Sequence, residues 1–180
     1  MVRKYTDKEL LTRVKALTSF VKIPDSYWLL GVRSIEDETD KFDDKFYLWK
    51  GEQFIMVTSG TTNKGLKGTA VMKDDMWFYN AYRYGLHRGK MKALRQVKPI
   101  PYYRDRNFDG KTDTNGPEYN DIIYMNIHGA TYHEGSDQIL NRIGAWSEGC
   151  QVLNNNDHYE KIVELVRPQR LMTYCLIKEF

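Results

Sequence analysis

The sequence contains little cysteine and no long hydrophobic run. Of its 180 residues, only Cys150 and Cys175 are cysteines, which excludes a framework of several disulfides and leaves at most one pair. No window approaches the roughly 20 apolar residues that a membrane-spanning helix needs. Residues 1–14 also lack the apolar core of a signal peptide. We therefore expect no membrane span, and a protein that works inside the cell that makes it unless something else carries it out.

The sequence also lacks a large excess of positive or negative charge. The formal net charge is +3, and acidic and basic residues are mixed along the chain. A nucleic-acid-binding domain usually concentrates its positive charge far more than this, so we expect no nucleic acid partner. The densest basic run, residues 87–98, is typical of a solvated face, although it would also suit contact with an anionic polymer such as a bacterial wall.

The sequence does contain enough apolar side chains for a folded core, with 41% hydrophobic and 13% aromatic residues. Thr6 and Glu9 form a capping-box pattern before apolar residues at helical spacing, which predicts a helix over residues 6–21. Short β-rich segments between turn residues follow, with a second predicted helix over residues 157–166. The expected fold class is therefore α+β and mainly β, with one or two peripheral helices.

Three of the predicted strands lie between residues 76 and 127. One covers residues 76–79, and one covers residues 97–103, whose two prolines suit an edge or an entry segment. Residues 122–127 form a strong candidate for a central strand. We divide the chain into an N-terminal helical extension, residues 1–24, and a single domain, residues 25–180.

The segment 126–153 contains the residues most typical of an active site. A predicted strand leads to His128 and Gly129, and 22 positions after the histidine a turn of small residues, 147–149, presents Cys150. A cysteine nucleophile needs a base within hydrogen-bond reach, and the base needs a third group that orients its ring. These residue types in this order therefore predict nucleophilic chemistry at the cysteine.

Each residue of the segment suits a specific task. His128 is the candidate base, and the accessible backbone carbonyl of Gly129 suits the orienting role. Gly149 allows backbone N–H groups to face a developing oxyanion without a side chain in the way. We expect an imidazolium–thiolate pair in which Cys150 reacts with alkylating agents even at mildly acidic pH.

The layout His-Gly followed by Ser-x-Gly-Cys resembles the catalytic domain of L,D-transpeptidases of the YkuD type. That family's motif reads His-Gly, a variable stretch, then Ser-His-Gly-Cys, a short apolar residue and Arg. The resemblance implies that Cys150 takes the acyl group of a peptidoglycan stem peptide, that His128 is the base, and that the Gly129 carbonyl orients the ring. Ser147 and Gly149 match the turn, and the N–H groups of Gly149 and Cys150 match the oxyanion donors.

The resemblance covers residues 122–153 and has two departures. Glu148 stands where the family has histidine, and Gln151-Val152 replaces the apolar-Arg ending. A Glu148 carboxylate that faced the thiol would raise the pKa of Cys150 and weaken the nucleophile. The fold that the resemblance implies is an L,D-transpeptidase-like β-sandwich or barrel, and the texture of the chain is also similar to phage-encoded proteins of this kind.

The implied function is acyl-enzyme chemistry on stem peptides with no cofactor required. An amine acceptor would make the enzyme a transpeptidase, and water would make it an L,D-carboxypeptidase or a lysin-like endopeptidase. The alternative, which Glu148 keeps open, is a non-catalytic wall-binding or virion component on the same scaffold. Action at the wall implies a protein that is virion-borne, released at lysis, or trimmed from a periplasmic precursor.

The remaining candidates are assigned by their surroundings in the sequence. Trp146, Glu148 and His133 are expected to contact the substrate; His133 competes with His128 as the base, although a polar loop holds a ring less rigidly than a strand end does. His87 and His158 are expected to be surface or structural residues. No Cys-x-x-Cys or His-x-x-x-His pair at ligand spacing indicates zinc.

A second candidate site is a loop that matches the first part of an EF-hand-type calcium loop. Its oxygens stand at positions one, three, five and nine, with a glycine at six, but position twelve is Gly116 instead of glutamate. Such residues also simply make turns, so the sequence leaves two alternatives open here, a plain turn or a loop that binds a structural calcium. The candidate ligands are Asp105, Asn107, Asp109, Lys111 and Asp113.

Overall fold

Short alternating apolar segments form most of the protein. The computed structural model describes residues 1–133, 135–145 and 147–180. The helices in these ranges are α1 (Asp7–Lys15) and α2 (Asn156–Val166). The strands are β1 (Tyr27–Arg33), β2 (Asp44–Lys50), β3 (Gln53–Thr61), β4 (Ala70–Met72), β5 (Met76–His87), β6 (Met91–Gln96), β7 (Ile100–Arg104), β8 (Tyr119–Asp121), β9 (Ile127–Gly129), β10 (Gln151–Leu153) and β11 (Met172–Lys178).

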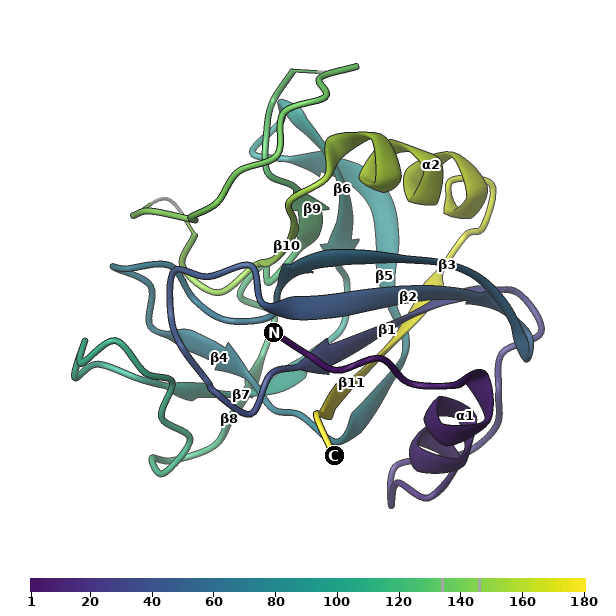
Figure 1. Ribbon diagram of the computed structural model, residues 1–180, viewed down its shortest axis with the longest axis horizontal. Coiled ribbons are helices and arrows are strands. Elements are labelled where there is room, and N and C mark those ends of the chain that lie inside the picture. Colours follow the sequence, from purple (N-terminus) through teal and green to yellow (C-terminus); the bar gives the residue numbers. More distant parts are fainter. Residues whose placement is uncertain (134, 146) are drawn as a thin grey trace.

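Eight of the strands in the described ranges close into a barrel with the order β1-β11-β5-β6-β9-β10-β3-β2, and β4, β7 and β8 form a small separate sheet (Figure 1). Helix α2 lies at one end of the barrel, where its apolar side chains join the core inside the barrel, and α1 lies near the other end (Figure 1). The expected α+β, mainly β class is confirmed. Neither of the two helices in the described part of the chain has the length and apolar character needed to cross a bilayer.

The barrel wall is buried on both sides along β1. Leu29 belongs to the core cluster inside the barrel, whereas its neighbours Trp28 and Leu30 belong to a second cluster that the N-terminal segment covers. This follows from strand geometry, because successive side chains point to opposite faces. Residues 1–24 therefore pack against the domain and contribute Leu10 and Val14 to this second core.

Helix α1 begins as predicted and ends earlier than predicted. Thr6 and Glu9 form the expected capping box. The helix stops at Lys15, whereas the sequence predicted helix to residue 21, because later polar groups find partners on β5. The Ser19 hydroxyl accepts from the Trp77 N–H at 3.0 Å, and the Val21 N–H donates to the Tyr79 hydroxyl at 2.9 Å. The apolar spacing continues past the helix because the side chains still pack on the barrel.

The predicted strand over residues 122–127 is wrong, and a buried glutamine explains the difference. Strand β8 ends at Asp121 and β9 starts at Ile127, and between them Tyr124 has a φ of 61°. The Gln96 side chain takes the place of a partner strand, because its Oε1 accepts from the backbone N–H of Met125 at 2.9 Å. The segment that contains β7 was predicted as an edge strand or an entry segment, but β7 lies in the centre of the small sheet between β4 and β8.

Strands β9 and β10 bring together segments that are distant in sequence. They pair in parallel, and Val152 lies opposite His128 in the register. Strand β9 also pairs with β6, where Ala93 lies opposite His128. His128, the middle residue of β9, therefore has a paired strand on each side. The turn that precedes β10 lies beside it.

Candidate active site

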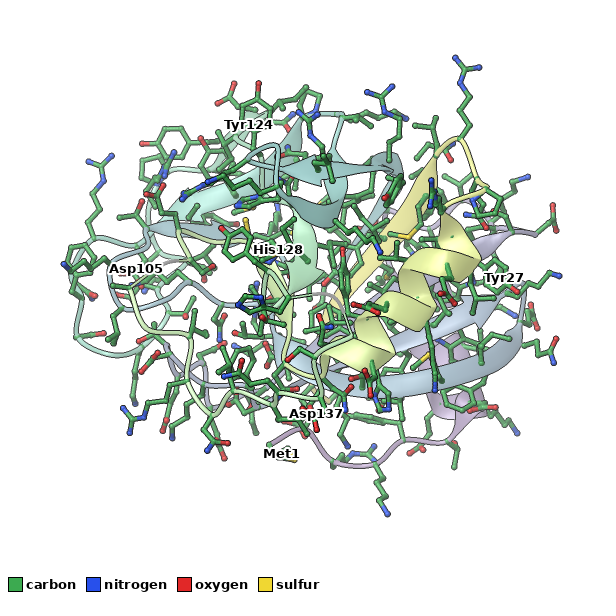
Figure 2. All side chains as sticks on the ribbon, turned by 90° about the horizontal axis from the view of Figure 1, so that it is seen from above. Met1, Tyr27, Asp105, Tyr124, His128 and Asp137 are labelled. Atoms are coloured by element: carbon green, nitrogen blue, oxygen red, sulfur yellow. The ribbon has the colours of Figure 1, made fainter. Side chains whose placement is uncertain are left out.

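The thiol of Cys150 and the imidazole of His128 lie together beside a cavity. Ligating atoms of these two side chains are within 4.8 Å of each other. Strand β9 carries the histidine, and the cysteine directly precedes β10. The His128 side chain is buried, whereas Cys150 is partly exposed to the cavity. Figure 2 shows His128 in the interior of the molecule, with Tyr124 nearer the surface.

One nitrogen of the His128 ring is committed to the backbone. Its Nδ1 lies 2.8 Å from the carbonyl oxygen of Gly129, the next residue. A carbonyl oxygen only accepts, so Nδ1 carries the hydrogen and Nε2 is the basic nitrogen of the neutral ring. The geometry therefore presents a base with a fixed tautomer next to a thiol.

Burial keeps both groups neutral at physiological pH. Burial lowers the pKa of His128 to about 4, an effect that nearby His87 and Arg88 increase and the Gly129 hydrogen bond opposes. Burial also raises the pKa of Cys150 to about 11, partly offset by the Asn126 backbone N–H and Arg88. This is the opposite of the imidazolium–thiolate pair expected from the sequence, because that expectation considered only the pairing of the two groups and not their desolvation.

The neutral thiol has a weak acceptor close by. Its Sγ donates to the carbonyl oxygen of Tyr124 at 3.6 Å. Glu148, whose side chain is exposed at the cavity, is the last of the causes that raise the pKa of Cys150. The family's histidine is replaced here by a carboxylate whose effect on the thiol is small beside that of burial.

The turn before Cys150 is fixed against the segment 65–70. The Gly65 N–H donates to the Ser147 carbonyl at 3.0 Å, and the Ala70 N–H donates to the Glu148 carbonyl at 3.0 Å. Gly149 has a φ of 143°, and a Cβ atom at this position would lie 2.3 Å from the Ala70 carbonyl oxygen. Glycine is therefore required here both for its backbone conformation and for the close approach of β4.

The same turn contains three polar groups that have no hydrogen-bond partner in the described part of the chain. The backbone N–H groups of Gly149 and Cys150 donate no hydrogen bond within the described part of the chain. The Ser147 hydroxyl is buried and has no partner in the described part of the chain. Two N–H groups beside a nucleophilic atom are the usual composition of an oxyanion hole.

The cavity has a volume of about 700 Å³ and a positively charged wall. Arg88 follows β5, Arg95 lies on β6, and Arg104 ends β7. Glu148 is the acidic residue among the described lining residues. The site therefore suits a ligand that carries carboxylates, which arginine binds with matched geometry.

His87 is a site residue that sequence reasoning missed. It ends β5 and lines the cavity, with its ring centroid 4.7 Å from that of His128. From the sequence, this strand was predicted to end at Tyr79 and His87 to be a surface or structural residue. The aromatic and apolar side chains at Tyr82, Tyr84 and Leu86 continue the two-residue period and are the signal that could have extended the strand to the site.

The residues predicted to bind substrate do not all lie in the cavity. Glu148 lines it. His133 is exposed, and it lines a separate small hollow next to α2, with Tyr159 among its walls. The structure thus does not bring His133 to the thiol. Trp146 lies outside the described residues.

The predicted calcium loop lies apart from His128, as the position of Asp105 in Figure 2 shows. The Asn107 amide donates to the carboxylates of Asp109 and Asp113 at 3.2 and 2.6 Å, so these side chains do converge. However, the buried Asp105 carboxylate pairs with the buried ammonium of Lys64 at 3.3 Å. The Lys64 ammonium is therefore the cation that pairs with Asp105, the residue at the first ligand position of the predicted loop. Calcium at this loop remains a prediction.

Comparisons with known proteins add little to this description. No protein-family model matches the chain, and no curated protein matches it. Among solved structures, the chain is similar to the helical cell shape determining protein Pgp2 from Campylobacter jejuni, with 14% sequence identity and a TM-score of 0.41. The match covers 97% of this chain and 56% of that one, so this chain spans about half the length of that protein.

Proposed function

We propose that this protein is a cysteine enzyme that acts on peptidoglycan stem peptides through a thioester at Cys150. The observation that carries the proposal is the set of groups around the sulfur. A base of fixed tautomer, His128, lies beside the thiol, and two N–H groups without acceptors in the described part of the chain lie at Gly149 and Cys150. Base, nucleophile and oxyanion donors are the components that acyl transfer needs.

The neutral ground state determines the first step. The Cys150 proton moves to Nε2 of His128 as the sulfur attacks the carbonyl carbon, because neither the imidazolium nor the thiolate is stable at this site before the attack. The carbonyl electron pair moves to the oxygen, which the two N–H groups stabilise. The tetrahedral intermediate then expels the amine, which takes the proton from His128, and a thioester remains.

The substrate class rests on two further features. The motif His-Gly with Ser-x-Gly-Cys resembles that of L,D-transpeptidases, whose acyl donors are stem peptides. The three arginines that line the cavity suit the carboxylates of such peptides. Water or an amine resolves the thioester, and the exposed cavity admits either. Because the substrate is part of the wall, the protein is expected to reach it from a virion, at lysis, or as a trimmed periplasmic protein.

The experiment is mass spectrometry of purified muropeptides after incubation with the protein in water enriched in ¹⁸O. Hydrolysis would place ¹⁸O in the shortened stem, and transpeptidation would give a cross-linked or exchanged product without it. The Cys150→Ala variant is the matched control, since one sulfur is lost at a turn and not in the core. Unchanged muropeptides with the wild-type protein, or equal turnover with the variant, would contradict the proposal.

A non-catalytic wall-binding module is the second candidate, and the raised pKa of Cys150 and the carboxylate of Glu148 favour it. Such a module would bind sacculi through the arginine-lined cavity without forming a covalent product. Binding to sacculi by Cys150→Ala at wild-type strength, together with the absence of any adduct with a carbapenem-type β-lactam in the wild type, would establish this candidate instead.

A further inference from the structure

Two histidines lie close to the Cys150 thiol, and this cluster of three side chains is compatible with two different chemistries. Ligating atoms of His87, His128 and Cys150 all lie within 4.8 Å of one another, which is close enough to hold a metal ion. Two histidines and a cysteine form a common set of zinc ligands. The same proximity would also allow His87 to take part in acyl transfer. The hydrogen bonds behind His87 distinguish the two.

The orientation of the Asn126 amide is fixed by the backbone. The Gln96 N–H donates to Asn126 Oδ1 at 3.0 Å, so the amide oxygen faces β6. The Asn126 Nδ2 group therefore faces Nδ1 of His87, at 2.9 Å. Exchanging the two amide ends would bring the amide NH₂ against the Gln96 N–H and leave both donors without an acceptor.

This contact determines the tautomer of His87. An NH₂ group only donates, so His87 Nδ1 accepts and carries no hydrogen. The neutral ring then has its hydrogen on Nε2. Protonating Nδ1 as well would set two donors against each other, and burial with the charges of Arg88 and Arg95 also lowers the pKa of His87. The side chain is therefore a neutral hydrogen-bond donor.

A donor of this kind is a poor metal ligand. A metal needs an unprotonated ring nitrogen. Nδ1 is occupied by Asn126, and Nε2 carries the hydrogen. Binding a metal through His87 would require the loss of the Asn126 hydrogen bond or a change of tautomer that sets Nδ1–H against the amide. The trio is therefore not built to hold a metal.

We propose that His87 is a further catalytic residue, which donates its Nε2–H to the oxyanion formed when the Cys150 sulfur attacks a carbonyl group. This proposal rests on the proposed acyl-transfer function. A ring nitrogen of His87 lies within 4.8 Å of the Cys150 sulfur, and the ring centroids of His87 and His128 are 4.7 Å apart. No hydrogen bond joins His87 to Cys150 in the described part of the chain. The oxygen of a tetrahedral intermediate lies one bond beyond the carbon attached to the sulfur, so it can come closer to His87 than the sulfur does.

The two histidines differ in whether they exchange a proton during the reaction. The thiol proton passes to Nε2 of His128 and later to the leaving amine, while His87 keeps its Nε2 hydrogen throughout and only donates a hydrogen bond. The developing negative charge thus meets a neutral side-chain donor in addition to the N–H groups of Gly149 and Cys150. Removing one such donor commonly lowers kcat by about 10²–10³-fold.

The experiment compares two reactions of the same sulfur. Acylation by p-nitrophenyl acetate passes through an oxyanion, whereas alkylation by iodoacetamide does not. We expect His87→Ala to slow acylation by about 10²–10³-fold and to change alkylation by less than about threefold. His87→Gln retains an N–H donor and should recover part of the acylation rate. His158→Ala, a histidine on α2 outside the cavity, serves as the matched control and should change neither rate.

A second readout tests the tautomer directly. Long-range ¹H–¹⁵N NMR of the wild type should show His87 with the hydrogen on Nε2, and the His87→Gln spectrum identifies the signals. A hydrogen on Nδ1, or protection of Cys150 from iodoacetamide by one equivalent of Zn²⁺ that is lost in His87→Gln, would overturn the proposal. Equal slowing of acylation and alkylation in both His87 variants, or acylation that neither variant slows, would overturn it too.

Failure of the proposed function has a different signature. If the wild type accepts acyl groups from the ester but leaves muropeptides unchanged, the substrate assignment is wrong and the role of His87 stands. If Cys150 is alkylated but accepts an acyl group from neither donor, both proposals are wrong.

Discussion

Nδ1 of His128 lies 2.8 Å from the carbonyl oxygen of Gly129, the residue that follows it in β9. No separate side chain is needed to orient the ring, because the end of the strand provides both the imidazole and the carbonyl group that it contacts. The contact leaves Nε2 as the basic atom. Burial lowers the pKa of the ring to about 4, so Nε2 is unprotonated at neutral pH. His128 is therefore a neutral imidazole of fixed orientation.

The buried imidazole should make stability depend on pH. The pKa of His128 is about 4 in the folded protein and 6.5 in the reference state. Below pH 6.5 the unfolded chain binds a proton that the folded protein does not, so the stabilisation is complete above 6.5 and is lost as the pH falls toward 4. The loss amounts to about 3 kcal/mol. Urea unfolding of wild type and His128→Ala between pH 7.5 and 4 measures it.

The difference between the two proteins is the quantity to follow. Burial also raises the pKa of Asp44 to about 6, which changes stability in the opposite direction over the same range. That contribution is common to both proteins and cancels in the difference. A difference in unfolding free energy that stays constant with pH would contradict the buried, neutral state of His128.

The pH dependence of alkylation tests the division of labour between the histidines. If His128 takes the thiol proton during attack, the reactive form of the pair is constant between its two pKa values, about 4 and about 11. The iodoacetamide rate of the wild type should therefore be nearly flat from pH 5 to pH 9. In His128→Ala only free thiolate reacts, so the rate should rise roughly tenfold per pH unit.

His133→Ala is the matched control for that experiment, because this exposed histidine lines a different hollow. Its profile should coincide with that of the wild type. A profile that changes with His133 and ignores His128 would show that the base is assigned wrongly. A sigmoidal wild-type profile with a midpoint near neutrality would contradict the neutral pair.

Gly149 should tolerate no side chain. Alanine at this position combines an unfavourable φ of 143° with a Cβ that lies 2.3 Å from the Ala70 carbonyl oxygen. We expect Gly149→Ala to lower the free energy of unfolding by roughly 2–5 kcal/mol and to remove acyl transfer. Gly51→Ala is the control: it has a φ of 57° and no neighbour within 4 Å of the added Cβ, so strain alone acts, at about 1 kcal/mol. Equal losses for the two variants would contradict the close packing of the turn.

Calcium is expected to raise the melting temperature if the loop around Asp109 binds it, since a ligand that binds only the folded state stabilises that state. Millimolar calcium should raise the midpoint of thermal unfolding and a chelator should reverse the shift. The double substitution Asp109→Asn and Asp113→Asn should abolish the response. An identical melting curve with calcium and with chelator would remove the metal and leave the Lys64–Asp105 ion pair as the brace of this loop.

The sequence predicted the features that depend on local pattern. The capping box of Thr6 and Glu9 and the mainly β class came from spacing alone, and Cys175 is the buried core residue that its apolar strand suggested. The proximity of His128 and Cys150 followed from a motif, although nothing in the spacing shows that their strands are parallel neighbours.

The features that the sequence missed depend on tertiary contacts. Residues 122–127 look like a strand, but a buried side chain, Gln96, replaces the partner strand there. His87 reaches the site only because β5 continues well past the predicted end. The neutral state of the thiol follows from burial, which no local pattern records.

The most direct test of the central claim is the intact mass of the protein after a short incubation with a defined stem peptide and an acid quench. The account predicts a mass increase equal to the acyl fragment, located at Cys150 and removed by hydroxylamine. Cys175→Ala should retain this adduct, because Cys175 is fully buried in the second core, which the N-terminal segment covers. The absence of an adduct on the wild type, or an adduct that persists in Cys150→Ala, would contradict the account.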